Sequence, residues 1–93
     1  MIVRFKCFGP LRRIIGTSVK EVEVPNNATV RDVILSIVVE GGNAVRRLIM
    51  DGESISGNLI LMLNQIDVQT LKGEETTVHE GDIITLLPHV QGG

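Results

Sequence analysis

Few side chains in this 93-residue sequence have types and spacings that could do chemistry. The single cysteine, Cys7, alternates with charged residues, which places it on the buried face of a strand beside Val3 and Phe5. A buried thiol behaves as a small hydrophobic group. A single cysteine also excludes an intramolecular disulfide and any metal site made of clustered cysteines.

The other candidate acid–base groups stand apart from one another. His79 lies in a polar segment and is expected to be solvated, while Glu80 and Asp82 flank a turn glycine and are expected to set its shape. His89 follows the last strand, in a segment without the fixed geometry that a general base needs. The sequence holds no paired carboxylates and no nucleophile beside a base. We therefore expect a protein that enzymes act upon, not a catalyst on its own.

One reactive group remains, the carboxylate that we expect at Gly93. A carboxylate is a poor acyl electrophile, so an external step must first convert it into a species with a good leaving group. Gly92 and Gly93 lack a Cβ, which lets them fit a narrow channel and lets an attacking group approach the backbone. Pro88 has no N–H and is expected to end the preceding strand. Residues 88–93 span at most roughly 20 Å when extended, so we expect a flexible tail that reaches into a partner.

Composition and charge narrow the classes of partner. Nine basic and eleven acidic residues give a net charge of −2, which argues against a nucleic-acid or membrane partner. The pairs Arg12–Arg13 and Arg46–Arg47 are expected to be solvated. Phe5 and Phe8 are the only aromatic residues, too few to stack bases. No apolar run approaches the roughly 20 residues of a membrane span, and no signal-peptide layout is present, so we expect a cytoplasmic protein.

The first third of the chain predicts a hairpin. Alternation predicts a strand over residues 2–8, a loop or short turn over residues 9–16, and a second strand over residues 19–24. Because the two strands are separated by about ten residues, they are expected to pair antiparallel.

A helix should follow, with Thr29 as N-cap and Asp32 near the positive end of the helix dipole. Its apolar residues recur at helical spacing and form one stripe, which comprises Val30, Val33, Ile34, Ile37 and Val38. Gly41–Gly42 should close this helix.

The remaining sequence predicts short elements. Asn43 is a candidate cap for a shorter helix that runs through Met50. Beyond it we expect a loop over residues 53–58, a buried central strand over 59–63, a tight turn at 64–65, a short edge strand or irregular segment over 66–71, a turn at 80–82 and a last strand over 83–87.

This element order favours a β-grasp domain over residues 1–87: a mixed sheet of four to five strands with one main helix on one face. The crossover requires a parallel pair, and the last strand is expected to lie centrally beside the first. A ferredoxin-like fold is the rival, but it needs a second full amphipathic helix, which residues 65–82 lack.

Alternation along the last strand predicts a second functional surface. If Ile84 and Leu86 face the helix, then Ile83, Thr85 and Leu87 lie on the opposite face of the sheet. An exposed apolar surface at the root of the tail would suit protein docking.

Three segments together resemble the MoaD/ThiS family of ubiquitin-like sulfur carriers, with the greatest likeness to the small subunits of molybdopterin synthase. They are VRFKCFGPLRRIIG, VPNNATVRDVI and EGDIITLLPHVQGG. Three places differ from the pattern of the family. His89 stands where relatives often have a second proline, and Leu86 or Leu87 stands where they often have an aromatic residue. Asn64–Gln65 stands where many have Asn-Gly. The resemblance therefore leaves the acceptor of the sulfur open.

The resemblance implies a complete carrier chemistry at Gly93. A ubiquitin-activating-type enzyme would use ATP and magnesium to adenylate the carboxylate, and a persulfide would convert it to a thiocarboxylate. The tail, with Pro88, His89, Val90, Gln91 and Gly92, would enter the large subunit of molybdopterin synthase, where the sulfur builds the dithiolene. The chain itself would bind no cofactor and would be the sulfur-carrying subunit of a sulfurtransferase.

Two alternatives remain open. One is a ubiquitin-like modifier joined to lysines, or a sulfur donor for tRNA thiolation. The other is a β-grasp interaction module without tail chemistry.

Overall fold

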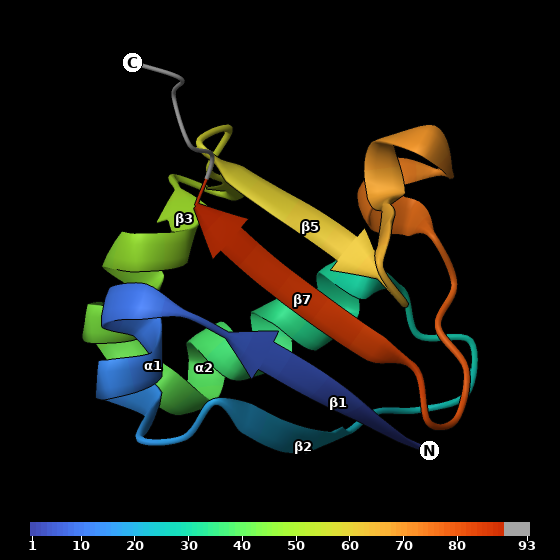
Figure 1. Ribbon diagram of the computed structural model, residues 1–93, viewed down its shortest axis with the longest axis horizontal. Helices are drawn as coiled ribbons and strands as arrows, with labels where there is room; N and C mark the ends of the chain where they lie inside the picture. The colour runs from blue at the N-terminus through green and yellow to red at the C-terminus, as the bar shows by residue number, and fades with distance from the viewer. Residues whose placement is uncertain (89–93) are drawn as a thin grey trace.

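The computed structural model describes residues 1–88, and their main feature is a five-stranded sheet (Figure 1). Its strand order is β2-β1-β7-β5-β6. The strands are β1 (Ile2–Cys7), β2 (Val19–Glu23), β5 (Leu59–Leu63), β6 (Ile66–Asp67) and β7 (Ile83–Pro88). β1 and β7 pair in parallel, whereas the other neighbours pair antiparallel. The predicted hairpin, the parallel pair and the central position of the last strand are confirmed.

Helix α2 (Val30–Ile49) packs across one face of the sheet, and it begins as predicted. The Thr29 side chain accepts a hydrogen bond from the Asp32 N–H, and the Asp32 carboxylate accepts one from the Thr29 N–H. This is a capping box, which satisfies two N–H groups that the first helical turn leaves without partners. The break predicted at the glycine pair is also present, because Gly42 has φ 74° and ψ −160°.

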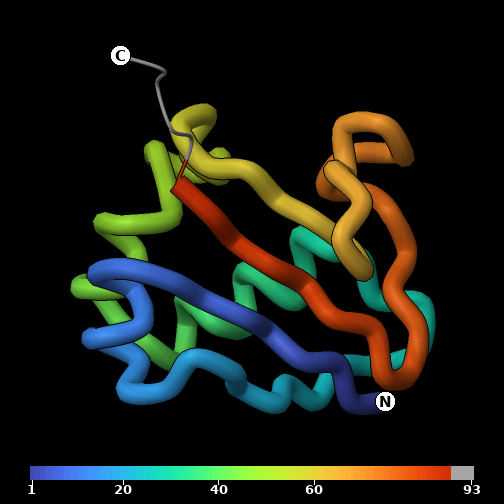
Figure 2. Tube along the Cα trace, in the orientation of Figure 1, coloured from blue at the N-terminus to red at the C-terminus, as the bar shows by residue number. Residues whose placement is uncertain are grey.

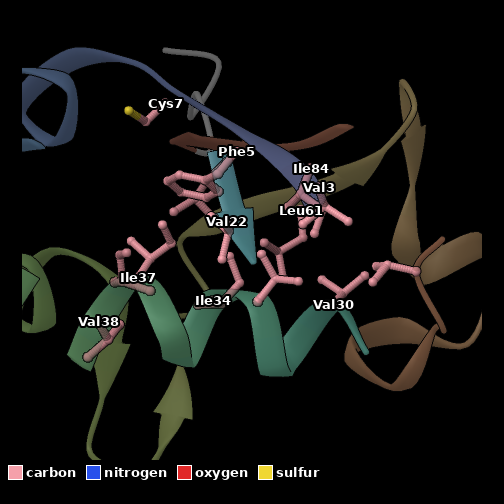
Figure 3. Close-up of a cluster of buried hydrophobic side chains, with 14 of the residues drawn as sticks. Val3, Phe5, Cys7, Val22, Val30, Ile34, Ile37, Val38, Leu61 and Ile84 are labelled. Atoms are coloured by element: carbon pink, nitrogen blue, oxygen red, sulfur yellow. The ribbon is translucent and has the colours of Figure 1, made fainter. Parts of the chain in front are cut away.

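The predicted apolar stripe of α2 forms the helix side of the core. Every one of its five residues is at most 2% exposed. Figure 3 shows the helix side chains meeting inward-facing residues of four strands, and its labelled members are Val3, Phe5, Cys7, Val22, Val30, Ile34, Ile37, Val38, Leu61 and Ile84. One sheet and one main helix thus enclose a single core, and the fold is β-grasp.

Helix α1 (Gly9–Ile15) corrects the loop predicted over residues 9–16. Pro10 stands in the first turn, where its missing N–H costs nothing. Gly16 adopts the left-handed conformation at φ 89° and donates its N–H to the Arg12 carbonyl, which ends the helix. Leu11, Ile14 and Ile15 have helical spacing, but the helix has only 7 residues and Leu11 is its buried one, so the pattern cannot repeat as it does in a longer helix.

A two-stranded ribbon corrects the loop predicted over residues 53–58. β3 (Met50–Asp51) pairs with β4 (Ser54–Ile55) across a turn in which Gly52 has φ 64°. The shorter helix expected through Met50 ends one residue earlier, because Met50 is extended and belongs to β3. Strands of two residues are too short to show an alternation pattern.

The segment from β5 to β7 agrees with the prediction in outline. Asn64 and Gln65 have φ values of 51° and 71°, as a tight hairpin turn requires. β5 lies inside the sheet, but only Leu61 and Leu63 are buried, so one of its faces is open. After β6 come two 3₁₀ helices, η1 (Val68–Thr70) and η2 (Gly73–Glu75), instead of an amphipathic α-helix. This excludes the ferredoxin-like rival.

The capping box yields a stability prediction. Thr29→Ala should lower the free energy of unfolding by about 1 kcal/mol, because the Asp32 N–H loses its acceptor. Thr29→Ser keeps the hydroxyl and should recover most of that loss. Urea denaturation of the three proteins measures the difference, and equal stability of the alanine and parent proteins would contradict it.

Candidate functional site

The candidate site is built around the end of the central strand. Pro88 belongs to β7 and lies opposite Leu59, so the strand runs one residue beyond its predicted end. The Leu59 N–H donates to the Ser56 carbonyl at 3.2 Å, away from β7. Proline, which has no N–H, is tolerated at such a strand end. The other predicted tail residues, His89, Val90, Gln91, Gly92 and Gly93, lie outside the described residues.

The predicted docking surface occupies the face of the sheet opposite α2. Ile84 and Leu86 point into the core and are 0% and 3% exposed. Ile83, Thr85 and Leu87 alternate with them on the other face and are half-buried. In Figure 1, α2 lies behind the sheet, and over residues 1–88 no α-helix covers the front face.

Strand register adds two apolar residues that the sequence reasoning missed. Ile60 lies opposite Leu87 and Met62 lies opposite Thr85, and both are half-buried. We call these five residues, Ile60, Met62, Ile83, Thr85 and Leu87, the outer patch. Alternation within residues 59–63 carries the signal, but it identifies the exposed face only once the pairing with β7 is known.

Basic residues border the outer patch on β1. Arg4 is aligned with Ile83 and Lys6 with Thr85. Arg4 is exposed and Lys6 is half-buried. The patch therefore combines an apolar centre with a cationic edge, an arrangement that suits a partner with an apolar surface and acidic margins.

A second apolar surface meets the outer patch at Pro88. It is a hollow of about 160 Å³ between the end of the sheet, α1 and the end of α2. Phe8, 44% exposed, forms part of its wall. The full lining comprises Phe8, Pro10, Leu11, Leu48, Leu59, Leu86 and Pro88. The sequence could not reveal this hollow, because it assembles residues from four separate segments of the chain.

Cys7, the nucleophile candidate, lies in register with Leu86 at this end of the sheet. Cys7 is buried, as predicted, and its S–H donates to the Thr17 carbonyl at 3.2 Å. Burial raises the pKa of the Cys7 thiol, and the nearby Arg12 guanidinium offsets only part of that rise. The group is therefore a protonated thiol at neutral pH, which is a poor nucleophile.

Asp82 shapes the turn before β7, as predicted, whereas the Glu80 side chain binds β1 and not the turn. The His79 N–H donates to the Asp82 carboxylate at 2.7 Å, and the Glu80 carboxylate accepts from the Ile2 N–H at 3.0 Å. Gly81 supplies the positive φ of 82°. Within residues 1–88, no three His, Cys, Asp or Glu side chains gather closely enough to hold a metal ion.

Helix length bears on membrane insertion. Neither α-helix of residues 1–88 combines the length and apolarity that crossing a bilayer requires.

Known proteins resemble this chain in both sequence and fold. The model of the ThiS family matches residues 5–93. Small archaeal modifier protein 3 of Haloferax volcanii is 31% identical over 93 residues, which is 100% of each chain. The solution structure of small archaeal modifier protein 1 from Methanosarcina acetivorans has a TM-score of 0.83 at 26% identity, covering 99% of this chain and 96% of that one.

A third relative is a chain in the crystal structure of the Amycolatopsis orientalis BexX/CysO complex. It has a TM-score of 0.75 at 28% identity, and the match covers 98% of this chain and 99% of that chain. The similarities extend over nearly the whole length in each comparison. The chain belongs to the ThiS family.

Proposed function

We propose that this chain is a ubiquitin-like protein modifier whose Gly93 carboxylate is activated and then joined to lysine amines. The single observation that carries the proposal is the 31% identity, over the full length of both chains, to a protein named as a small archaeal modifier. The activating partner is a ubiquitin-activating-type enzyme that uses ATP and magnesium.

The chemistry needs little from the domain itself. The Gly93 carboxylate attacks the α-phosphate of ATP, pyrophosphate leaves, and the acyl-adenylate then loses AMP to an amine. Within residues 1–88, no group of side chains could hold a metal ion. We therefore expect the enzyme to supply both the magnesium and the base for these steps. The role of the domain is to bind that enzyme and to hold Gly93 within reach of its active site.

The outer patch is the docking surface that fits this role. It borders Pro88, and five residues beyond Pro88 span at most about 18 Å to Gly93. An enzyme that holds the carboxylate therefore also lies close to Leu87 and Ile60. Arg4 and Lys6 can pair with acidic residues at the margin of the same interface.

Reconstitution tests the proposal directly. The chain is incubated with the adenylating enzyme of its host, ATP, magnesium and a lysine-bearing acceptor protein, and intact masses are measured. We expect an adduct equal to the two proteins minus one water, and we expect none without ATP. If Gly93 stays an unmodified carboxylate under these conditions, the chain is an interaction module without tail chemistry.

Sulfur transfer is a second candidate, favoured by the match of the ThiS family model over residues 5–93. With a persulfide donor present, Gly93 would gain the mass of one oxygen replaced by sulfur. As the small subunit of molybdopterin synthase, the chain would donate that sulfur to the dithiolene inside the large subunit. In a host lacking the chain, loss of dithiolene would favour this route, whereas loss of thiolated tRNA bases would favour tRNA thiolation and loss of lysine adducts would favour the modifier.

A further inference from the structure

The described residues present four primary amines, and two of them are already engaged. The Met1 ammonium donates to the Val24 carbonyl at 2.8 Å and is partly buried. The Nζ of Lys20 lies 2.7 Å from a carboxylate oxygen of Glu40, and the lysine is half-buried against the helix. An amine held as an ammonium in such contacts must be released before it can attack an acyl group.

Lys6 is a third amine, and its position is unfavourable. It is half-buried on the same face as the outer patch, in register with Thr85. A partner docked on that patch would cover it. Lys6 is therefore least accessible in the complex that the proposed function requires.

Lys72 differs from the other three amines. It is exposed, and over residues 1–88 its Nζ has no carboxylate within 4 Å and no hydrogen-bond partner. It stands between η1 and η2, in a segment stiffened by its own hydrogen bonds. The Lys72 N–H donates to the Thr76 hydroxyl at 3.0 Å, and that hydroxyl donates to the Gly73 carbonyl at 2.8 Å.

Arg31 occupies one of the carboxylates near Lys72. Its Nη1 lies 2.8 Å from a carboxylate oxygen of Glu74, two residues from Lys72, and its Nη2 donates to the Glu53 carbonyl at 2.7 Å. The Glu74 carboxylate is therefore paired from the helix side, and this contact fastens the 3₁₀ segment to α2.

The 3₁₀ segment also lies far from the end of β7. Figure 2 shows residues 68–76 (orange) and the end of β7 (red) at opposite sides of the molecule. A group attached at Lys72 would leave Pro88 and the adjoining end of the outer patch, Leu87 and Ile60, uncovered. The modified chain would keep the surface beside Pro88 for its own activation.

We propose that Lys72 is an acceptor site, at which Gly93 of a second copy of this chain forms an isopeptide bond. This inference rests on the proposed function. The neutral Nζ attacks the carbonyl carbon of the Gly93 acyl-adenylate made from ATP, a C–N bond forms, the bond to the phosphate oxygen breaks, and AMP leaves with the electron pair. One proton passes from nitrogen to solvent. Because the acceptor keeps its own Gly93, the reaction can extend into a chain of copies.

The experiment uses this chain as both donor and acceptor, with the adenylating enzyme, ATP and magnesium. Lys72 is the last lysine or arginine in the sequence, so trypsin releases residues 73–93 of the donor attached to Lys72 of the acceptor. We expect that branched peptide in the parent protein, loss of the self-adduct in Lys72→Arg, and its retention in the matched variants Lys6→Arg and Lys20→Arg.

The outcomes separate this inference from the proposed function. Adducts on other proteins without a self-adduct, or a self-adduct that survives Lys72→Arg, would overturn the Lys72 site and leave the modifier role intact. No adduct on any protein would overturn both. Lys72 is exposed and unpaired, so the arginine variant should unfold at the same urea concentration as the parent.

Discussion

Deletion of Gly93 is expected to abolish adduct formation while changing the free energy of unfolding by less than about 0.5 kcal/mol. The deletion withdraws the carboxylate by about 3.5 Å, and a misplacement of 1 Å already costs about a hundredfold in rate. Stability should be unaffected because the buried core residues run from Val3 to Leu86 and none lies near the deletion.

Gly93→Ala is the matched variant, because it keeps the length and adds one methyl group beside the reacting carbonyl. It should form adducts more slowly than the parent, since the methyl group crowds the attacking amine. Intact mass spectrometry measures the adduct, and urea denaturation measures the stability. Undiminished adduct formation after the deletion would show that Gly93 is not the reacting residue.

Leu87→Asp is expected to slow adduct formation by about ten- to a hundredfold, the loss that follows when an interface anchor is removed. Leu87 lies beside Pro88 and opposite Ile60, at the Pro88 end of the outer patch. A charge there must be desolvated when the enzyme docks. The effect should appear as a raised KM for the chain with little change in kcat, because docking is impaired and the carboxylate is unchanged.

Val39→Asp provides the control for Leu87→Asp. Val39 is 77% exposed on α2, on the other side of the sheet, so the same charge is introduced away from the patch. We expect the kinetics of the parent from it. Equal KM values for the two variants would mean that the activating enzyme docks elsewhere, and the hollow beside Phe8 would then be the next surface to test.

The sequence predicted the large elements of the fold because they carry repeated signals. The α2 stripe supplies five apolar residues at helical spacing, and Thr29 with Asp32 marks its start. Alternation in β1 and β7 shows which side chains are buried. Helix α1 and the β3–β4 ribbon were missed because they are too short for a pattern to repeat within them. They form through capping and through contacts with distant residues.

Only the part of the candidate site that lies on a single strand could be predicted from the sequence. The facing of Ile83, Thr85 and Leu87 came from alternation within residues 83–87. The pairing of Ile60 with Leu87 depends on register between strands that lie more than twenty residues apart. The contact of Arg31 with Glu74, which anchors the segment that carries Lys72, joins residues 43 apart along the chain, and no local pattern encodes it.

The parallel pairing of β1 with β7 has a consequence for the synthesis of the chain. β7 is hydrogen-bonded to both β1 and β5, so the sheet lacks its central member until residues 83–88 have left the ribosome. Contacts between residues so distant in sequence also form late and slowly during folding. We expect nascent and truncated chains to remain unfolded. An activating enzyme that recognises the complete sheet would therefore adenylate only chains that contain β7. Incomplete chains would not consume the ATP of the activation step.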